Sequence, residues 1–180
     1  MSAGIMIPIA LLPIAGLLLG IFAAVQNNVS QATHPGVFAM AAFFKNGAEA
    51  VFGNLPTLFA IAIAVAFTNQ SGVAALSAFV GWLIFNATQT ALIFPGNSQT
   101  FTILYYNSVP ATALAMNVGL RSLSTSVFGG VIVGAITALL FNKFHTIQLP
   151  KVVGFFNGNR FVPIITLLTM LPVALVALMI

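Results

Sequence analysis

Residues 11–25 read LLPIAGLLLGIFAAV, and residues 129–141 read GGVIVGAITALLF. Both stretches are free of charged residues, and neither alternates apolar with polar positions as a strand of a membrane barrel would. A helix satisfies all its backbone hydrogen bonds within its own segment, so a continuous apolar run can cross lipid in that form. The two stretches therefore predict membrane-spanning α-helices.

The composition agrees with a membrane protein. Of the 180 residues, 60% are hydrophobic and only 3% are charged, whereas soluble domains carry roughly 25% charged residues. Five cations spread over the chain form no basic patch, so the net charge of +4 does not indicate a nucleic-acid partner. The chain has no cysteine, which excludes disulfides, thiolate metal sites and phosphocysteine within it.

Five apolar stretches approach the roughly 20 residues that a helix needs to span the hydrocarbon core. They are residues 3–25, 50–67, 73–94, 124–141 and 161–180. Two further apolar pieces, 37–44 and 109–120, are too short to span and are expected to be interfacial or re-entrant. The predicted fold is all-α: a polytopic bundle of about five transmembrane helices with short interfacial or re-entrant segments.

The cations predict the orientation of the bundle. Three of the five, Lys143, Lys151 and Arg160, lie with His145 in the connection 142–160. Lys and Arg near span ends mark the cytoplasmic side, so we expect this loop to be cytoplasmic. Alternation then places the N-terminus and the TNQSG loop inside, and residues 26–47 and 95–123 outside.

Four blocks carry a resemblance to a known family. Residues 154–165, GFFNGNRFVPII, resemble the GFFGGKRFVPI motif of the membrane-spanning IIC components of bacterial sugar phosphotransferase systems, glucose superfamily. The same family is matched in order by LLPIAGLLLGIF, by VFGNLPTLFAIAIAVAFTNQSGVAAL and by VFGGVIVGAITALLFNKFHTIQLP. The FTNQSG segment is most similar to the glucose-specific branch, followed by the N-acetylglucosamine and maltose branches.

The resemblance implies that residues 1–180 are the N-terminal half of a multi-pass IIC permease domain in the cytoplasmic membrane. It implies transport of a hexose, glucose first, coupled to phosphorylation, without a cofactor. The implied partners are the lipid bilayer, the C-terminal half of the IIC domain, the cytoplasmic IIB and IIA phosphocarriers, and a second copy in a homodimer. In the family, the sugar-coordinating residues and the phosphorylated IIB cysteine lie outside this half. We therefore expect no catalytic residue here, and whether the chain counts as an enzyme stays open.

Three polar residues are candidates for substrate binding. Glu49 is the only acidic residue, and an ionisable group near a span is a functional candidate. Lys45, one helical turn earlier, is the alternative partner that would simply neutralise it. Arg121 is either an arginine that reaches the outer interface or a partner for Glu49 across the bundle. Asn54, next to Pro56, marks either an ordinary kink or a broken helix near a site.

Two glycine pairs and one loop complete the candidates. Gly16 with Gly20 and Gly130 with Gly134 match the GxxxG pattern, which predicts close helix packing or dimerisation. His145 in the cationic loop is an interface residue or part of a docking face for IIB. The two histidines and one carboxylate are too far apart in sequence to predict a metal site.

Two other classes of function stay open on the sequence alone. An unrelated channel or secondary transporter would need ionisable residues that line its pathway, and only Glu49 and Arg121 qualify. A stand-alone membrane scaffold would need no site at all.

Overall fold

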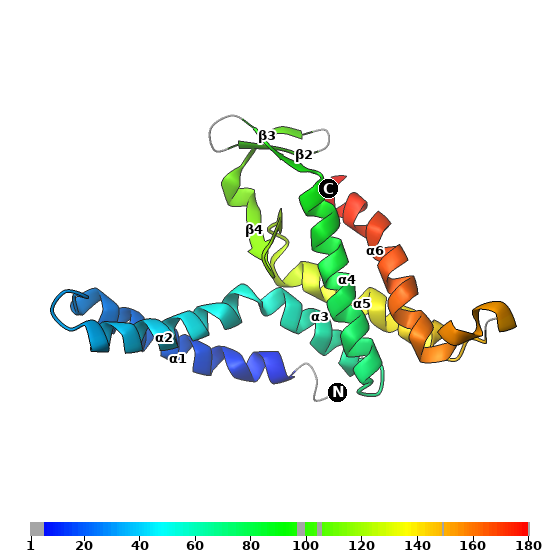
Figure 1. The fold of residues 1–180 in the computed structure, drawn as a ribbon, viewed down its shortest axis with the longest axis horizontal. Coiled ribbons are helices and arrows are strands. Elements are labelled where there is room, and N and C mark those ends of the chain that lie inside the picture. The colour runs from blue at the N-terminus through cyan, green and yellow to red at the C-terminus, as the bar shows by residue number, and fades with distance from the viewer. Residues whose placement is uncertain (1–5, 97–99, 104–105, 149, 180) are drawn as a thin grey trace.

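The structure is a computed structural model that describes residues 6–96, 100–103, 106–148 and 150–179. Figure 1 shows its helices, whose bounds are α1 (Met6–Asn28), α2 (Pro35–Gly53), α3 (Leu55–Ala66), α4 (Gly72–Ala91), α5 (Ser126–Phe144) and α6 (Phe161–Met179). Within these residues, α1, α4, α5 and the helical stretch that ends with α6 are long and apolar enough to span a membrane, and the bent pair α2–α3 would be a fifth span. The predicted polytopic helical bundle is confirmed.

Helices α1 and α2 form a hairpin that projects away from α4, α5 and α6 (Figure 1). The ring of Phe22 stacks on that of Phe44 with centroids 4.7 Å apart, which joins the two helices of the hairpin. The side chains of Ile14, Leu17 and Ile21 on α1 are exposed. An apolar surface of this kind is solvated by lipid, so its exposure agrees with a membrane location.

The region expected as one span at 50–67 differs from the prediction. The helix begins earlier, at Pro35, and breaks at Asn54, where α2 and α3 meet at a bend of 54°. Pro56 has no N–H to donate back into α2, so α2 cannot continue through it. It lies in the first turn of α3, where a missing N–H leaves no helical hydrogen bond unmade. The backbone N–H of Asn54 bonds the Ala50 carbonyl at 3.2 Å and closes α2.

The same extension of α2 changes two other expectations. The short apolar piece 37–44 lies inside α2 rather than in a separate interfacial element. Most of the stretch 26–47, expected as an outer loop, is consequently helical. A sequence window that looks for uniformly apolar residues missed this helix because Lys45, Asn46 and Glu49 lie within it.

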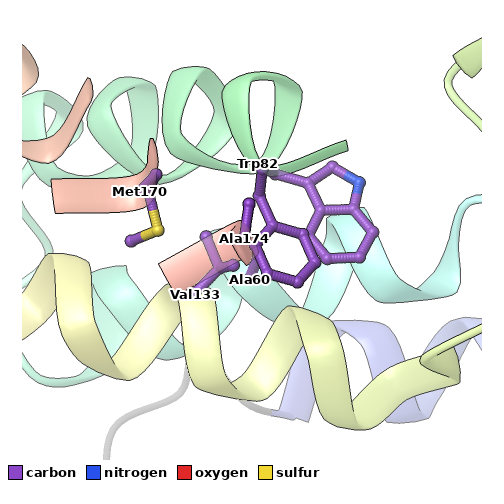
Figure 2. Close-up of a cluster of buried hydrophobic side chains, with 6 residues drawn as sticks. Ala60, Trp82, Val133, Met170 and Ala174 are labelled. Carbon is purple, nitrogen blue, oxygen red and sulfur yellow. The ribbon is translucent and has the colours of Figure 1, made fainter. Parts of the chain in front are cut away.

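Helices α3, α4, α5 and α6 share one core. Figure 2 shows Trp82 on α4, with Ala60, Val133, Met170 and Ala174 contributed by the three other helices. Trp82 is fully buried and stacks on Phe85 with ring centroids 5.7 Å apart. Small alanines beside one large indole let the helices approach closely, which matters in lipid because dispersion contacts rather than water exclusion hold helices together.

The connection between α4 and α5 folds into two small antiparallel sheets, which the sequence analysis did not predict. The first contains β1 (Ile93–Pro95), β2 (Thr100–Ile103) and β3 (Tyr106–Pro110), and the second contains β4 (Leu114–Asn117) and β5 (Leu120–Leu123). Val118 and Gly119, with φ of 52° and 81°, form the two-residue turn between β4 and β5. The apolar piece 109–120, expected to be interfacial or re-entrant, instead contains the end of β3, a 3-10 turn over Ala111–Ala113 and strand β4, which pairs with β5.

The loops lie at two opposite ends of the central bundle. The Asn142 side chain donates to the Phe67 carbonyl at 3.0 Å, so the loop after α3 and the loop after α5 lie together. The strands lie at the other end of α4, where that helix ends (Figure 1). This is the relative arrangement that the predicted topology requires of the TNQSG loop, the 142–160 loop and residues 95–123.

The absolute orientation stays a prediction, and cysteine labelling tests it. The chain has no native cysteine, and both Thr146 and Thr112 are exposed at opposite ends of the bundle. We expect a membrane-impermeant maleimide added to intact cells to label Thr112→Cys and to spare Thr146→Cys until the membrane is permeabilised. If Thr146→Cys were labelled in intact cells and Thr112→Cys were not, the orientation in the membrane would be the reverse of the predicted one.

Candidate functional site

A buried polar network joins the second half of α4 to strand β5. Asn86 and Ser122 are almost fully buried, and the Ser122 hydroxyl donates to Asn86 Oδ1 at 2.6 Å. Asn117 on β4 donates to the Ser122 oxygen at 2.9 Å. Asn86 also donates to the Trp82 carbonyl of its own helix at 2.7 Å. These bonds form a continuous chain from the hairpin to the helix.

Two further contacts extend this network along α4. The Leu123 N–H donates to Gln89 Oε1 at 3.0 Å, and the Thr90 hydroxyl donates to the Arg121 carbonyl at 2.7 Å. Most of the polar atoms are therefore occupied by one another, and the network fastens the strands to the bundle. Within the described chain, Gln89 Nε2 is buried without a hydrogen-bond partner.

Sequence reasoning missed this network although a signal was present. Residues 86–90 read NATQT inside an otherwise apolar helix. The spacing of three and four residues places Asn86, Gln89 and Thr90 on neighbouring positions of one helix face. A polar face on a membrane helix predicts a polar neighbour, but the sequence did not show that this neighbour is a β-hairpin.

Glu49 is engaged by the lysine one turn before it. Lys45 Nζ lies 3.3 Å from Glu49 Oε1, and both side chains are partly exposed. Exposed pairs of this kind in water contribute about 0–1 kcal/mol. The only acidic side chain of the chain therefore has a local partner on α2.

Asn54 and Arg121 have separate partners of their own. Asn54 Nδ2 donates to the Ala50 carbonyl at 2.8 Å and so caps the end of α2. The Arg121 guanidinium lies over the Phe101 ring, with its central carbon 4.9 Å from the ring centroid. Among the described residues, the structure shows no hydrogen bond or ion pair that joins Glu49, Asn54 and Arg121.

The two glycine pairs have different surroundings. A Cβ placed on Gly130 would collide with the Pro56 carbonyl of α3, and one on Gly134 would lie 2.5 Å from the Ala60 carbonyl oxygen. Gly130 and Gly134 therefore lie where α5 touches the backbone of α3. A Cβ on Gly16 would meet only the Phe52 ring at 3.9 Å, and one on Gly20 would meet nothing within 4 Å.

The residues of the cationic loop lie at the end of the bundle where α5 ends and α6 begins. His145 Nδ1 lies 2.9 Å from the Phe141 carbonyl at the end of α5, where its ring stacks on Phe141. The Arg160 guanidinium lies 4.8 Å from the centroid of the exposed Phe155 ring. Lys143 is in the last turn of α5, and the Lys151 side chain lies outside the described residues.

The described residues were also compared as possible metal ligands. In that part of the chain, no three His, Cys, Asp or Glu side chains lie close enough together to hold a metal ion. The polar groups described above are the network between α4 and the hairpin, the Lys45–Glu49 ion pair, Arg121 over Phe101, and the cationic end of the bundle.

Comparison with known proteins shows which family the chain belongs to. The family model described as "Phosphotransferase system, EIIC" matches residues 2–180. The chain belongs to the phosphotransferase-system EIIC family. Membership makes this EIIC chain a multi-pass membrane domain, in agreement with its apolar helices.

Three relatives of this EIIC chain carry the name "PTS system glucose-specific EIICBA component". The protein from Mycoplasma genitalium is 52% identical over all of this chain and 20% of its own length. That from Mycoplasma pneumoniae is 50% identical over the same shares, and that from Staphylococcus saprophyticus is 40% identical over 89% of this chain and 23% of its own length. The EIIC chain therefore spans about a fifth of the length of these relatives.

Proposed function

We propose that this EIIC chain forms the N-terminal half of the membrane domain of a glucose permease that couples translocation to phosphorylation. The observation that carries the proposal is the shared name of the relatives: all three are called glucose-specific, and two of them match the whole chain at 50% identity or more. Permeases for N-acetylglucosamine or maltose are the alternatives within the family. A channel or a stand-alone scaffold finds no support in these names.

In this proposal the chain supplies a scaffold rather than a sugar site. Three of its buried polar side chains, Asn86, Gln89 and Ser122, already bond the hairpin to α4. A groove of about 630 Å³ between α1 and α2 is lined mainly by apolar side chains. A hexose needs several convergent polar groups, which we assign to the C-terminal half of the IIC domain.

The proposed partners are the other parts of the same system. The relatives' printed name, EIICBA, joins C, B and A components in one protein. We assign docking of the IIB part to the end of the bundle that holds Lys143, His145 and Arg160. We also propose a homodimer with the α1 surface around Gly16 and Gly20 in its interface, because that surface is apolar and open.

The glucose assignment is tested with the full-length protein to which we assign this chain. Vesicles that contain it, supplied with phosphoenolpyruvate and the soluble phosphocarriers, should convert external labelled glucose to internal glucose phosphate. We expect the rate with glucose to exceed the rates with N-acetylglucosamine and maltose. A higher rate with either competitor would reassign the sugar, and sugar accumulation without phosphorylation would exclude the coupled mechanism.

A further inference from the structure

Arg121 has an unusual place in the charge distribution of the chain. It is the only charged side chain between Glu49 and Lys143. The chain contains no acidic residue other than Glu49, and that carboxylate lies 3.3 Å from Lys45. No second side-chain carboxylate exists in the sequence that could neutralise the guanidinium of Arg121.

The structure holds Arg121 in a defined position. Its carbonyl accepts the hydrogen bond from Thr90, which ties β5 to the end of α4. Its guanidinium lies over the Phe101 ring of the neighbouring sheet. An arginine held at both its backbone and its side chain loses less conformational freedom on binding a ligand than a free one.

A cleft opens beside this guanidinium. It has a volume of about 350 Å³, and Thr90, Ile93, Phe101, Met116 and Arg121 are among its lining residues. A smaller hollow of about 210 Å³ shares Phe101, Met116 and Arg121 with it. The cleft thus combines one cation with a wall that is partly polar and partly formed by the apolar side chains of Ile93, Phe101 and Met116.

The surface around the cleft is apolar and open. Met116, which lines the cleft, is 62% exposed, and Phe94, between the lining residues Ile93 and Pro95 but on the other face of β1, is 56% exposed. Both belong to strands at the end of α4, where that membrane helix stops. A cation surrounded by exposed apolar side chains at the end of a span is typical of the boundary between headgroups and acyl chains.

We propose that the Arg121 cleft binds the phosphate group of an anionic phospholipid. The planar guanidinium donates two parallel N–H bonds to two phosphate oxygens, which is the geometry that arginine favours. The acyl chains lie along the apolar side chains of Ile93 and Met116, which line the cleft. A free hexose fits less well because its hydroxyls would face Met116 and Phe101 without partners. The bound lipid fixes the hairpin layer at the membrane interface.

Titration with phosphatidylglycerol tests the site on the 180-residue chain in a neutral detergent, with bound lipid counted by native mass spectrometry. Arg121→Gln should weaken the tightest phosphatidylglycerol by about tenfold or more, since a hydrogen bond between charged groups contributes about 1.5–3 kcal/mol. Lys143→Gln removes the same charge at the opposite end of the bundle and should leave that lipid bound as in the unmodified chain.

A second variant and two competitors make the result specific. Met116→Glu keeps Arg121 but places a carboxylate opposite it in the β4–β5 ladder, where it can pair with the guanidinium, and this variant should also weaken the binding of phosphatidylglycerol. Circular dichroism and thermal melting of each variant verify that the fold is retained. Equal binding by Arg121→Gln and the unmodified chain would overturn the proposal. So would displacement of the lipid by equimolar inorganic phosphate or by glucose, which would show a site for a free anion or for sugar.

Discussion

The 180-residue chain by itself should bind no glucose at micromolar concentration and should form no glucose phosphate. A sugar that leaves water needs replacement hydrogen bonds, and each one left unmade costs about 1–3 kcal/mol. The buried amides of Asn86 and Asn117 are already bonded to Ser122 and to the helix backbone, so they are not free to receive a sugar. Without a cysteine, the chain also has no thiolate to carry a phosphoryl group.

This expectation is checked by calorimetry and by a transfer assay. The purified chain is titrated with glucose and then incubated with phosphorylated IIB and labelled glucose. The full-length protein, treated in the same detergent, is the positive control, because both measurements should succeed there. Micromolar binding to the 180-residue chain, or labelled sugar phosphate above background, would place the site within these helices and refute the assignment of a scaffold role.

Gly130→Ala should destabilise the bundle, whereas Gly20→Ala should not. In an exposed helix interior, replacing Gly by Ala gains about 1 kcal/mol of helix propensity. At Gly130 the added methyl would overlap the Pro56 carbonyl, which belongs to the backbone and cannot rotate away. Overpacking of this kind costs about 1–3 kcal/mol or more, so the steric effect outweighs the gain in propensity. At Gly20 there is no neighbouring atom within 4 Å, and only the gain remains.

The two variants are compared by thermal unfolding in the same detergent. Gly134→Ala is measured with them, because its added methyl would also collide with α3 and should destabilise the bundle. We expect a lower melting temperature for Gly130→Ala and an unchanged or higher one for Gly20→Ala. Equal melting temperatures for both would show that α5 does not contact α3 through these glycines. Gly20→Ile, examined for its dimer fraction by crosslinking, tests the proposed α1 interface, and an unchanged fraction would locate that interface elsewhere.

The end of α2 shows what a local signal in the sequence can predict. Pro56 and Asn54 indicated a kink or a broken helix, and the structure has a bend of 54° there. The signal could not decide how far the helix extends on the N-terminal side. Lys45 and Glu49 look like loop residues when they are counted as charges, although one turn of helix brings them within 3.3 Å of each other.

The candidate residues show the limit of reasoning along the chain. The spacing of Gly130 and Gly134 predicted close helix packing or dimerisation without naming a neighbour, and in the structure the backbone of α3 lies beside both glycines. Arg121 lies 20 residues after Phe101 and 31 residues after Thr90, and no periodicity connects them. Their meeting depends on how the strands fold back over the end of α4.

The sequence by itself determined the class of the protein and its continuously apolar helices, but not α2. Continuous apolar runs such as residues 11–25 have one stable solution in lipid, since a helix satisfies its backbone within its own segment. The tertiary structure decided where side chains distant in sequence meet: Asn86 with Ser122, Asn142 with Phe67, and Arg121 with Phe101. Such contacts depend on the packing of whole elements against one another, and hydrophobic patterning carries no information about which polar side chain faces which partner.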